Sequence, residues 1–230
     1  NNGTFVFDKT NKLLNKNINT KNYSSLKFVH AQKKEAKNFI NDNNHLEGIH
    51  NTINTSIAIS IAKELNINDN KIEMAIKCFK GLSHRMEPLY VSKKLKIIND
   101  SKSTNGESTA AALKTFRNIF WIVGGEPKDD GIGQAKNFLA RVKEVFLIGN
   151  STNYFSKEIL KFNKNIPLNE CITLENATKL AIKKSKISKF ESHVILLSPS
   201  AASFDQFKNF EDRGNKFKKI VNTQLYKGLI

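Results

Sequence analysis

The chain has 230 residues, 39% of them hydrophobic, and a formal net charge of +16. This length supports one large domain or two smaller ones, and the composition excludes collagen-like and disordered chains. No apolar run approaches the length of a membrane span, and the opening Asn1-Asn2-Gly3 does not resemble a signal peptide, so we expect no membrane association. Because the chain opens as if inside a domain, we also expect further sequence upstream.

The basic residues are nearly all Lys and are spread along the whole chain. A nucleic-acid site usually concentrates Lys, Arg and aromatic residues on one face, so this spread indicates a compositional bias. A diffuse positive field still favours polyanionic ligands such as nucleotides. A basic nucleic-acid-binding module remains an alternative at this point.

The two cysteines, Cys78 and Cys171, are far apart, and the five histidines form no HxH or HExxH pattern. We therefore expect no protein-held metal site in this chain. Two free thiols are typical of a reducing compartment, which predicts a cytoplasmic protein.

The amino-terminal part contains two short strand-like runs, Thr4–Phe7 and Leu26–Val29. The spacing of apolar residues then predicts a helix from His50 to about Leu65, with Ile53, Ile57, Ala58, Ile61, Ala62 and Leu65 carrying its period. A second helix is predicted over Asp69–Phe79, with Gly81 as its C-cap.

A different pattern begins near Val91, where short apolar strands alternate with helical segments. The predicted strands are Leu95–Asn99, Phe120–Val123, Val145–Ile148, Cys171–Leu174 and Val194–Leu197. The predicted helices are Glu107–Phe116, Gln134–Val142, Phe155–Phe162, Glu175–Lys184 and Gln206–Tyr226. This alternation predicts an α/β fold with a mostly parallel, Rossmann-like sheet, and ligands at the carboxyl ends of its strands. We place a domain boundary near Pro88, which gives domains 1–88 and 89–230.

Two polar clusters lie at predicted helix ends. In Gly48–Asn54, Asn51 and Asn54 share a helix face and could read the edge of adenine; alternatively, one of them is an N-cap and the other is solvated. In Gly81–Glu87, Arg85 could stack on a base or hold phosphate. In the same cluster, His84 could be a structural hydrogen-bonder and Glu87 could pair with Arg85.

A third cluster, Asn99–Asn105, follows a predicted strand and precedes a helix. Asp100 could accept hydrogen bonds from ribose, Lys102 could neutralise phosphate or an acyl-phosphate oxygen, and Thr104 could bind a carboxylate. The alternative is a capping loop with Asn105 or Thr104 as N-cap.

The segment Ser198–Asn215 follows the apolar run Val194–Leu197, and its small residues allow a sharp turn whose N–H groups and hydroxyls face a ligand. The sequence contains no GxxxxGK[ST] phosphate loop. Gly131–Lys136 lacks the third glycine and the preceding strand of a dinucleotide fingerprint.

These segments, in this order, resemble the Mur ligase family, and within it the branch that adds D-glutamate. The matching segments are HNTIN, GLSHRMEPL, NDSKSTN, the pair Gly124-Gly125 with nearby Lys128, and LLSPSAASFDQFKNFEDRGNKF. They span about residues 46–230. The Asp-Asn-Pro-Arg motif of the branch that adds a diamino acid is absent.

The resemblance implies an enzyme with a UDP-sugar domain, a central ATP-binding P-loop domain and a carboxyl-terminal Rossmann-like domain for the amino acid. This chain would hold the end of the central domain and all of the last one. The implied substrates are UDP-N-acetylmuramoyl-L-alanine, D-glutamate and ATP, with Mg²⁺ held mostly outside this chain, in a monomer that binds no nucleic acid.

The resemblance also implies roles for individual residues. The implied ATP contacts are Asn51, Asn54, His84, Arg85, Asp100 and Lys102, with Lys102 as the catalytic lysine. The implied D-glutamate contacts are Thr104, Lys128, Ser203, Phe204 and Phe210. Periodicity alone leaves Phe204 and Phe210 open as core residues. A related ATP-dependent ligase such as a folylpolyglutamate synthase remains the runner-up.

Overall fold

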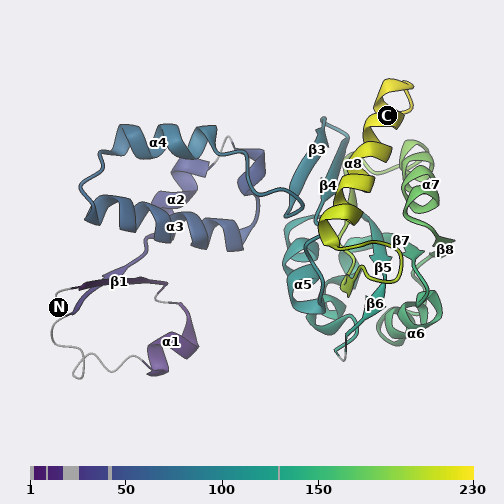
Figure 1. The fold of residues 1–230 in the computed structure, drawn as a ribbon, viewed down its shortest axis with the longest axis horizontal. Coiled ribbons are helices and arrows are strands. Elements are labelled where there is room, and N and C mark those ends of the chain that lie inside the picture. Colours follow the sequence, from purple (N-terminus) through teal and green to yellow (C-terminus); the bar gives the residue numbers. More distant parts are fainter. Residues whose placement is uncertain (1–2, 9, 18–25, 41–42, 129) are drawn as a thin grey trace. The chain divides into compact units, whose positions relative to one another are not determined.

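The structure is a computed structural model that describes residues 3–8, 10–17, 26–40, 43–128 and 130–230 (Figure 1). The chain divides into two compact units, residues 1–80 and 81–230.

The first unit combines two short strands with several helices. Its elements are β1 (Gly3–Phe7), α1 (Lys12–Asn17), β2 (Leu26–His30), α2 (Lys33–Ile40), the 3-10 helix η2 (Asn44–Leu46), α3 (Ile49–Glu64) and α4 (Asp69–Cys78). β1 and β2 pair in parallel, with Phe5 opposite Phe28. Helices α2, α3 and α4 pack through Ala36, Ile59 and Ile72. The two predicted strands and the two predicted helices are confirmed.

Helix α3 buries a different face from the one that its apolar period suggests. Ile61 and Leu65 are 45% and 67% exposed, whereas Thr52, Ser56 and Ser60 are buried. These hydroxyls donate to carbonyls within one turn, as Ser60 Oγ does to Ser56 O at 2.9 Å. A hydroxyl that is satisfied by its own helix can be buried at little cost, so these small residues pack beside Ile59 on the buried face.

Helix α4 ends earlier than predicted. Phe79 is its C-cap, and the prediction of Gly81 in that role is wrong. Gly81 does adopt a left-handed φ of 72° at the start of the second unit.

The second unit is built on a six-stranded sheet in the order β3-β4-β9-β5-β7-β8, and β6 and β10 form a separate two-stranded sheet. The strands of the unit are β3 (Glu87–Val91), β4 (Leu95–Asn99), β5 (Ile119–Gly124), β6 (Glu126–Pro127), β7 (Val142–Ile148), β8 (Leu168–Ile172), β9 (His193–Leu197) and β10 (Ala201–Ala202). Its helices are α5 (Gly106–Thr115), the 3-10 helix η3 (Gly133–Arg141), α6 (Thr152–Phe162), α7 (Leu174–Lys186) and α8 (Phe210–Tyr226). Strands β4, β9, β5, β7 and β8 are parallel, β3 is antiparallel to β4, and β6 pairs with β10. The predicted α/β fold with a mostly parallel sheet is confirmed.

Successive side chains of the central strands point to opposite faces of the sheet, and each face has its own core. On β5, Trp121 joins a cluster with residues of α5, η3 and α6, whereas Phe120 and Ile122 join a cluster with residues of α7 and α8. The apolar runs that predicted β5, β7 and β9 are therefore continuous because helices cover both faces.

Three secondary-structure assignments differ from the sequence prediction. Strand β8 runs over Leu168–Ile172, so Leu174 opens α7 instead of ending a strand. The segment predicted as a helix at 134–142 is the 3-10 helix η3, and α8 starts at Phe210 instead of Gln206. Pro88, near which the sequence places a domain boundary, lies within β3.

The connections around β9 define where loops converge. The chain leaves β4 and β5 toward α5 and η3 on one face, and leaves β9 toward α8 on the other face. In open α/β sheets, a ligand binds at the carboxyl edge where neighbouring strands diverge in this way. Among the described helices, none combines the length and the apolar character needed to cross a bilayer.

Candidate active site at the carboxyl edge of the sheet

The loops after β4, β9 and β5 touch one another through their backbones. Asp100 N donates to Leu197 O at 2.8 Å, and Ser200 N donates to Ser103 O at 3.0 Å. Gly124 N donates to Pro199 O, also at 3.0 Å. Three of the sequence segments with polar motifs therefore meet at one edge of the sheet.

Asp100 is buried at the centre of this edge. Its Oδ2 accepts from the hydroxyls of Ser103 and Ser198, the latter at 2.9 Å, and its Oδ1 accepts from Met86 N at 3.1 Å. Burial raises the pKa of Asp100 to about 6, although these hydrogen bonds and Arg85 act in the opposite direction. Because both oxygens are occupied, Asp100 orders the loop that carries Lys102.

Lys102 is exposed at the same strand end. Its Nζ lies 5.7 Å from the centre of the Phe210 ring, and its backbone N donates to His84 O at 2.9 Å. Phe210 is half-buried at the start of α8 and meets the His84 ring edge to face at 6.4 Å. The structure thus brings Lys102, His84 and Phe210 together.

His84 is a buried hydrogen-bonding residue with a left-handed φ of 64°. Its Nδ1 lies 3.0 Å from Asn99 Nδ2, and burial lowers the pKa of the imidazole although Glu87 opposes the shift. Glu87 pairs with Lys218 at 2.6 Å, so the predicted alternative of a pair with Arg85 is wrong. Burial alone would raise the pKa of Glu87, but Lys218 and the His84 N–H lower it. Arg85 itself is exposed.

Arg213 on α8 is 1% exposed and ties two of these loops together. Its Nε donates to Ser101 Oγ at 3.0 Å, and its Nη2 donates to Ser101 O and Ala201 O at 2.9 and 3.1 Å. Its Nη1 donates to Ala202 O at 3.3 Å. Burial lowers the pKa of Arg213 to about 10, with Asp205 acting in the opposite direction, so the guanidinium stays charged at neutral pH.

Sequence reasoning assigns no role to Arg213, although a signal is present. Arg is rare in this Lys-rich chain, and the first turn of a helix usually carries acidic residues, as Glu211 and Asp212 do here. An Arg in that turn indicates a specific set of hydrogen-bond acceptors, since the planar guanidinium can donate to several carbonyls at once.

Glycines allow the strand ends to approach closely. A Cβ at Gly125 would lie 2.3 Å from Ala202 O, and a Cβ at Gly149 would lie 2.3 Å from Asp205 Oδ2. Both glycines also have positive φ values. A Cβ at Gly124 would likewise lie 2.0 Å from Ile148 O, so packing at this edge requires both glycines of the Gly124-Gly125 pair, independently of any ligand.

The residues assigned to D-glutamate surround the same edge. Thr104 is half-buried immediately before Asn105, which is the N-cap of α5 and accepts from Ser108 N at 2.9 Å. Lys128 is exposed just after β6, and Ser203 is buried just after β10. Phe204 is 68% exposed, so it is not a core residue.

Asn51 and Asn54 lie on α3 in the first unit. Asn51 is half-buried, and its Nδ2 donates to Glu47 O at 2.9 Å. Asn54 is exposed. Gly48 occupies the N-cap position of α3, so neither asparagine caps this helix.

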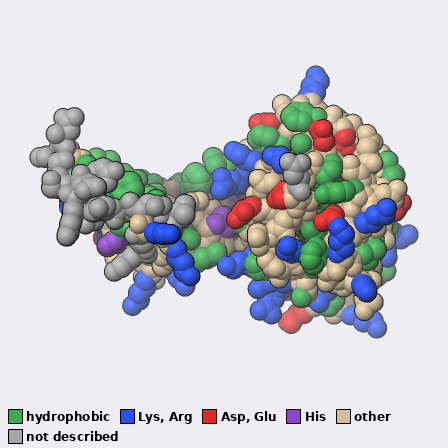
Figure 2. All heavy atoms as spheres, turned by 90° about the horizontal axis from the view of Figure 1, so that it is seen from below, with side chains coloured by type: hydrophobic (Ala, Val, Ile, Leu, Met, Phe, Trp, Pro, Cys, Tyr) green, Lys and Arg blue, Asp and Glu red, His purple; other side chains and the backbone are tan. Residues whose placement is uncertain are grey.

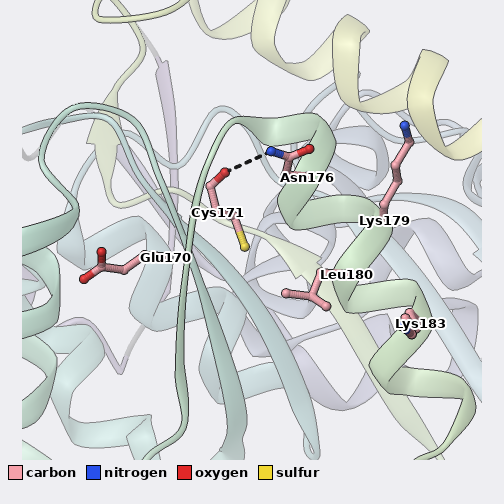
Figure 3. A pocket seen from close by; sticks show the side chains of 6 residues that line it. All are labelled: Glu170, Cys171, Asn176, Lys179, Leu180 and Lys183. Carbon is pink, nitrogen blue, oxygen red and sulfur yellow. Dashed lines mark hydrogen bonds between the residues drawn. The ribbon is translucent and has the colours of Figure 1, made fainter.

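A shallow pocket lies elsewhere, beside the edge strand β8 and α7 (Figure 3). It is lined by Glu170, Cys171, Asn176, Lys179, Leu180 and Lys183. Burial, with Glu144 adding to it, raises the pKa of Cys171 to about 11, so the thiol is a poor nucleophile. None of the candidate site residues lines this pocket, and we place the site at the carboxyl edge because the polar groups converge there.

Two further features bear on the possible ligands. Within the described part of the chain, no group of three or more His, Cys, Asp and Glu side chains is arranged to hold a metal ion. Lys and Arg side chains are scattered over the face of the molecule shown in Figure 2, with acidic side chains between them.

Comparison with known proteins identifies the relatives of this chain. No protein-family model matches it. It is 38% identical over 176 residues to the UDP-N-acetylmuramoylalanine–D-glutamate ligase of Rhodopseudomonas palustris, which covers 76% of this chain and 37% of that protein. It is 36% identical over 191 residues to the ligase of the same name from Rickettsia conorii, which covers 82% of this chain and 37% of that protein. The chain thus spans less than half the length of these relatives.

Solved structures agree with this match at the level of the fold. The chain aligns with a UDP-N-acetylmuramoylalanyl-D-glutamyl-2,6-diaminopimelate–D-alanyl-D-alanyl ligase from Acinetobacter baumannii at a TM-score of 0.60 and 13% identity, over 95% of this chain and 51% of that one. By sequence, the chain is a relative of the UDP-N-acetylmuramoylalanine–D-glutamate ligases and belongs with them to the Mur ligase family.

Proposed function

We propose that this chain is part of an ATP-dependent ligase that joins D-glutamate to the alanyl carboxylate of UDP-N-acetylmuramoyl-L-alanine. The similarity to ligases of that name supports the reaction class. The observation that carries the proposal is the convergence of the loops after β4, β5 and β9, because these loops contain the most specific of the resembling segments.

On the amino-acid side, we assign the two carboxylates of D-glutamate to cations and hydroxyls at the sheet edge. Lys128 supplies an exposed ammonium, and Thr104 and Ser203 supply hydroxyls. Phe204 and Phe210 form the apolar wall of the same site. Holding the amine in line with its target contributes to the rate by removing the entropy cost of bringing the two together.

On the nucleotide side, we assign Lys102 to the phosphate groups, since its exposed ammonium lies at a strand end. Asp100 would act on the ribose side mainly by ordering the loop that carries Lys102. On the basis of the resemblance alone, His84, Arg85, Asn51 and Asn54 are proposed as adenine contacts. Most Mg²⁺ ligands would come from parts of the ligase outside this chain.

The proposed chemistry is a two-step amide synthesis. The alanyl carboxylate attacks the γ-phosphorus of ATP, which releases ADP and gives an acyl phosphate. The amine of D-glutamate then attacks the acyl carbon, and the tetrahedral intermediate collapses with loss of phosphate and a proton. Lys102 would stabilise the charge on the phosphoryl and acyl oxygens.

The domain assignment follows from the same proposal. Residues 1–88 would be the end of the central ATP-binding domain, and residues 89–230 would be the amino-acid-binding domain. The whole enzyme would be a cytoplasmic monomer that acts on small molecules. The relatives from Rhodopseudomonas palustris and Rickettsia conorii both carry the D-glutamate name, which favours this reaction over folylpolyglutamate synthesis and over nucleic-acid binding.

An assay of the product of the complete reading frame tests the proposal. We expect ADP release to require UDP-N-acetylmuramoyl-L-alanine and to occur with D-glutamate but not with L-glutamate. The 230-residue chain alone should be inactive, because it has no phosphate loop to hold the triphosphate. Failure of the complete enzyme to use D-glutamate would overturn the proposal.

A further inference from the structure

The residues Ser203–Phe207 form a closed turn at the carboxyl edge of the sheet. Gln206 N and Phe207 N both donate to Ser203 O, at 3.2 and 2.8 Å. Phe207 packs against the hydrophobic cluster beneath α7 and α8. These contacts close the turn and anchor it on the core, and it contains both Ser203 and Phe204.

Two side chains of this turn reach the neighbouring strand ends. Asp205 Oδ2 accepts from Asn150 N at 3.1 Å, in the loop after β7. Gln206 Nε2 donates to Ile172 O at 3.1 Å, at the end of β8. Gly149 N donates to the same Ile172 carbonyl at 2.8 Å, so the ends of β7 and β8 are themselves joined.

The contact of Asp205 has two further supports. Asn150 precedes α6, whose N-cap residue Ser151 makes no side-chain capping bond, so the Asp205 carboxylate lies near the positive end of that helix. The carboxylate also occupies space that only a glycine at position 149 leaves open, since a Cβ there would lie 2.3 Å from Asp205 Oδ2.

We propose that Asp205 and Gln206 are positioning residues, which fix the Ser203–Phe207 turn on the ends of β7 and β8 so that Ser203 and Phe204 face the incoming amino acid. This inference rests on the proposed function, because it assigns the turn to the amino-acid site. A displacement of the turn by about 1 Å is enough to cost a large factor in a reaction that depends on alignment.

The first experiment needs no substrate and uses the 230-residue chain. Amide hydrogen exchange of Asn150 is followed by NMR in the wild type, Asp205→Ala and Asp205→Asn. We expect exchange at Asn150 to accelerate at least tenfold in Asp205→Ala. Asp205→Asn, which keeps an acceptor oxygen, should retain most of the protection. Unchanged exchange in Asp205→Ala would overturn the proposed contact.

The second experiment uses the complete ligase and separates KM from kcat. Asp205→Ala should raise the KM for D-glutamate at least tenfold while the KM for ATP stays within twofold, and Asp205→Asn should lie between it and the wild type. The matched control is Glu191→Ala, which removes an exposed carboxylate that precedes β9, at the opposite end of that strand. An Asp205→Ala enzyme with an unchanged KM for D-glutamate, or with equal losses for both substrates, would contradict the positioning role.

The two experiments test different claims, so a negative result in one does not decide the other. A wild-type enzyme that does not use D-glutamate overturns the proposed function and the assignment of the turn to the amino-acid site. The exchange measurement still decides whether Asp205 holds the turn.

Discussion

The guanidinium of Arg213 lies 2.9 Å from the main-chain oxygen of Ser101, across 112 positions of sequence. Through this bond and those to Ala201 and Ala202, a single side chain of α8 fixes the loop after β4 against the loop after β9. The two loops that carry most of the candidate site are thus held by an interaction that binds no ligand itself.

Replacing Arg213 should therefore destabilise the fold. Arg213→Ala leaves Ser101 O, Ala201 O and Ala202 O without their donor, and we expect the free energy of unfolding to fall by about 3 kcal/mol. Urea denaturation of the 230-residue chain measures this. Arg117→Ala, at an exposed position, should change stability by no more than about 0.5 kcal/mol. Equal effects of the two substitutions would contradict the bridging role of Arg213.

Asp100 should make stability depend on pH. Burial raises its pKa in the folded chain to about 6, above its ordinary value, so the folded state binds the proton more tightly than the unfolded state does. The stabilising contribution of Asp100 to the free energy of unfolding is therefore fully present below about pH 4, and it is lost as the pH rises through 6.

Comparison with Asp100→Asn isolates this effect, because the other groups titrate in both proteins. From pH 4 to pH 8 the wild type should lose up to ~3 kcal/mol of unfolding free energy relative to the variant. Urea denaturation across this range provides the measurement. A difference that does not change with pH would contradict the raised pKa.

Replacing Gly214 by Ala should destabilise the chain, although the same replacement in most helices is stabilising. Replacing Gly by Ala in a helix normally stabilises it by up to about 1 kcal/mol. Here the new Cβ would lie 2.2 Å from His84 Nδ1, so Gly214→Ala should destabilise the chain by about 1–3 kcal/mol as His84 is displaced from Asn99. Thermal unfolding tests this against Asn215→Ala, an exposed neighbour on α8 that should be neutral or stabilising. A stabilised Gly214→Ala chain would contradict the packing described.

Ile172 should be a site where stability can be gained. It is a β-branched residue with a φ of 63°, and its side chain is 49% exposed, so it bears backbone strain with limited compensation from burial. Ile172→Asn should raise the unfolding free energy by about 1 kcal/mol, or Tm by about 2–4 °C, since Asn tolerates the left-handed region. The control is Ile187→Asn, whose backbone has a φ of −92°. A gain in the control alone would count against strain at Ile172.

The sequence predicts the buried parts of this fold best. Strands β5, β7 and β9 are covered on both faces and therefore read as continuous apolar runs. Edge strands give weaker signals: β3 contains Pro88, and β8 contains Asn169 and Glu170, so the pattern misses the first and places the second two or more residues late. Helix α3 is predicted correctly, but its buried hydroxyls show that an apolar period does not always mark the packed face.

The candidate site is predictable where motif residues follow strands, as Asp100, Lys102 and Ser203 do. The sequence cannot show that Asp100 and His84 are buried and hydrogen-bonded within the protein. Asp100 accepts from Ser198, which is distant in the chain, and His84 contacts Asn99, which lies at the end of another element. The role of Arg213 depends on three carbonyls, which no pattern of side chains reveals.

If the carboxyl edge of this sheet binds D-glutamate, removing the exposed ammonium of Lys128 must weaken that binding. In the complete ligase, the KM for D-glutamate is compared between the wild type, Lys128→Ala and the exposed-lysine control Lys189→Ala. We expect a rise of at least tenfold in Lys128→Ala, with the KM for ATP unchanged and the control like the wild type. An unchanged KM for D-glutamate in Lys128→Ala would contradict the placement of the amino acid at this edge.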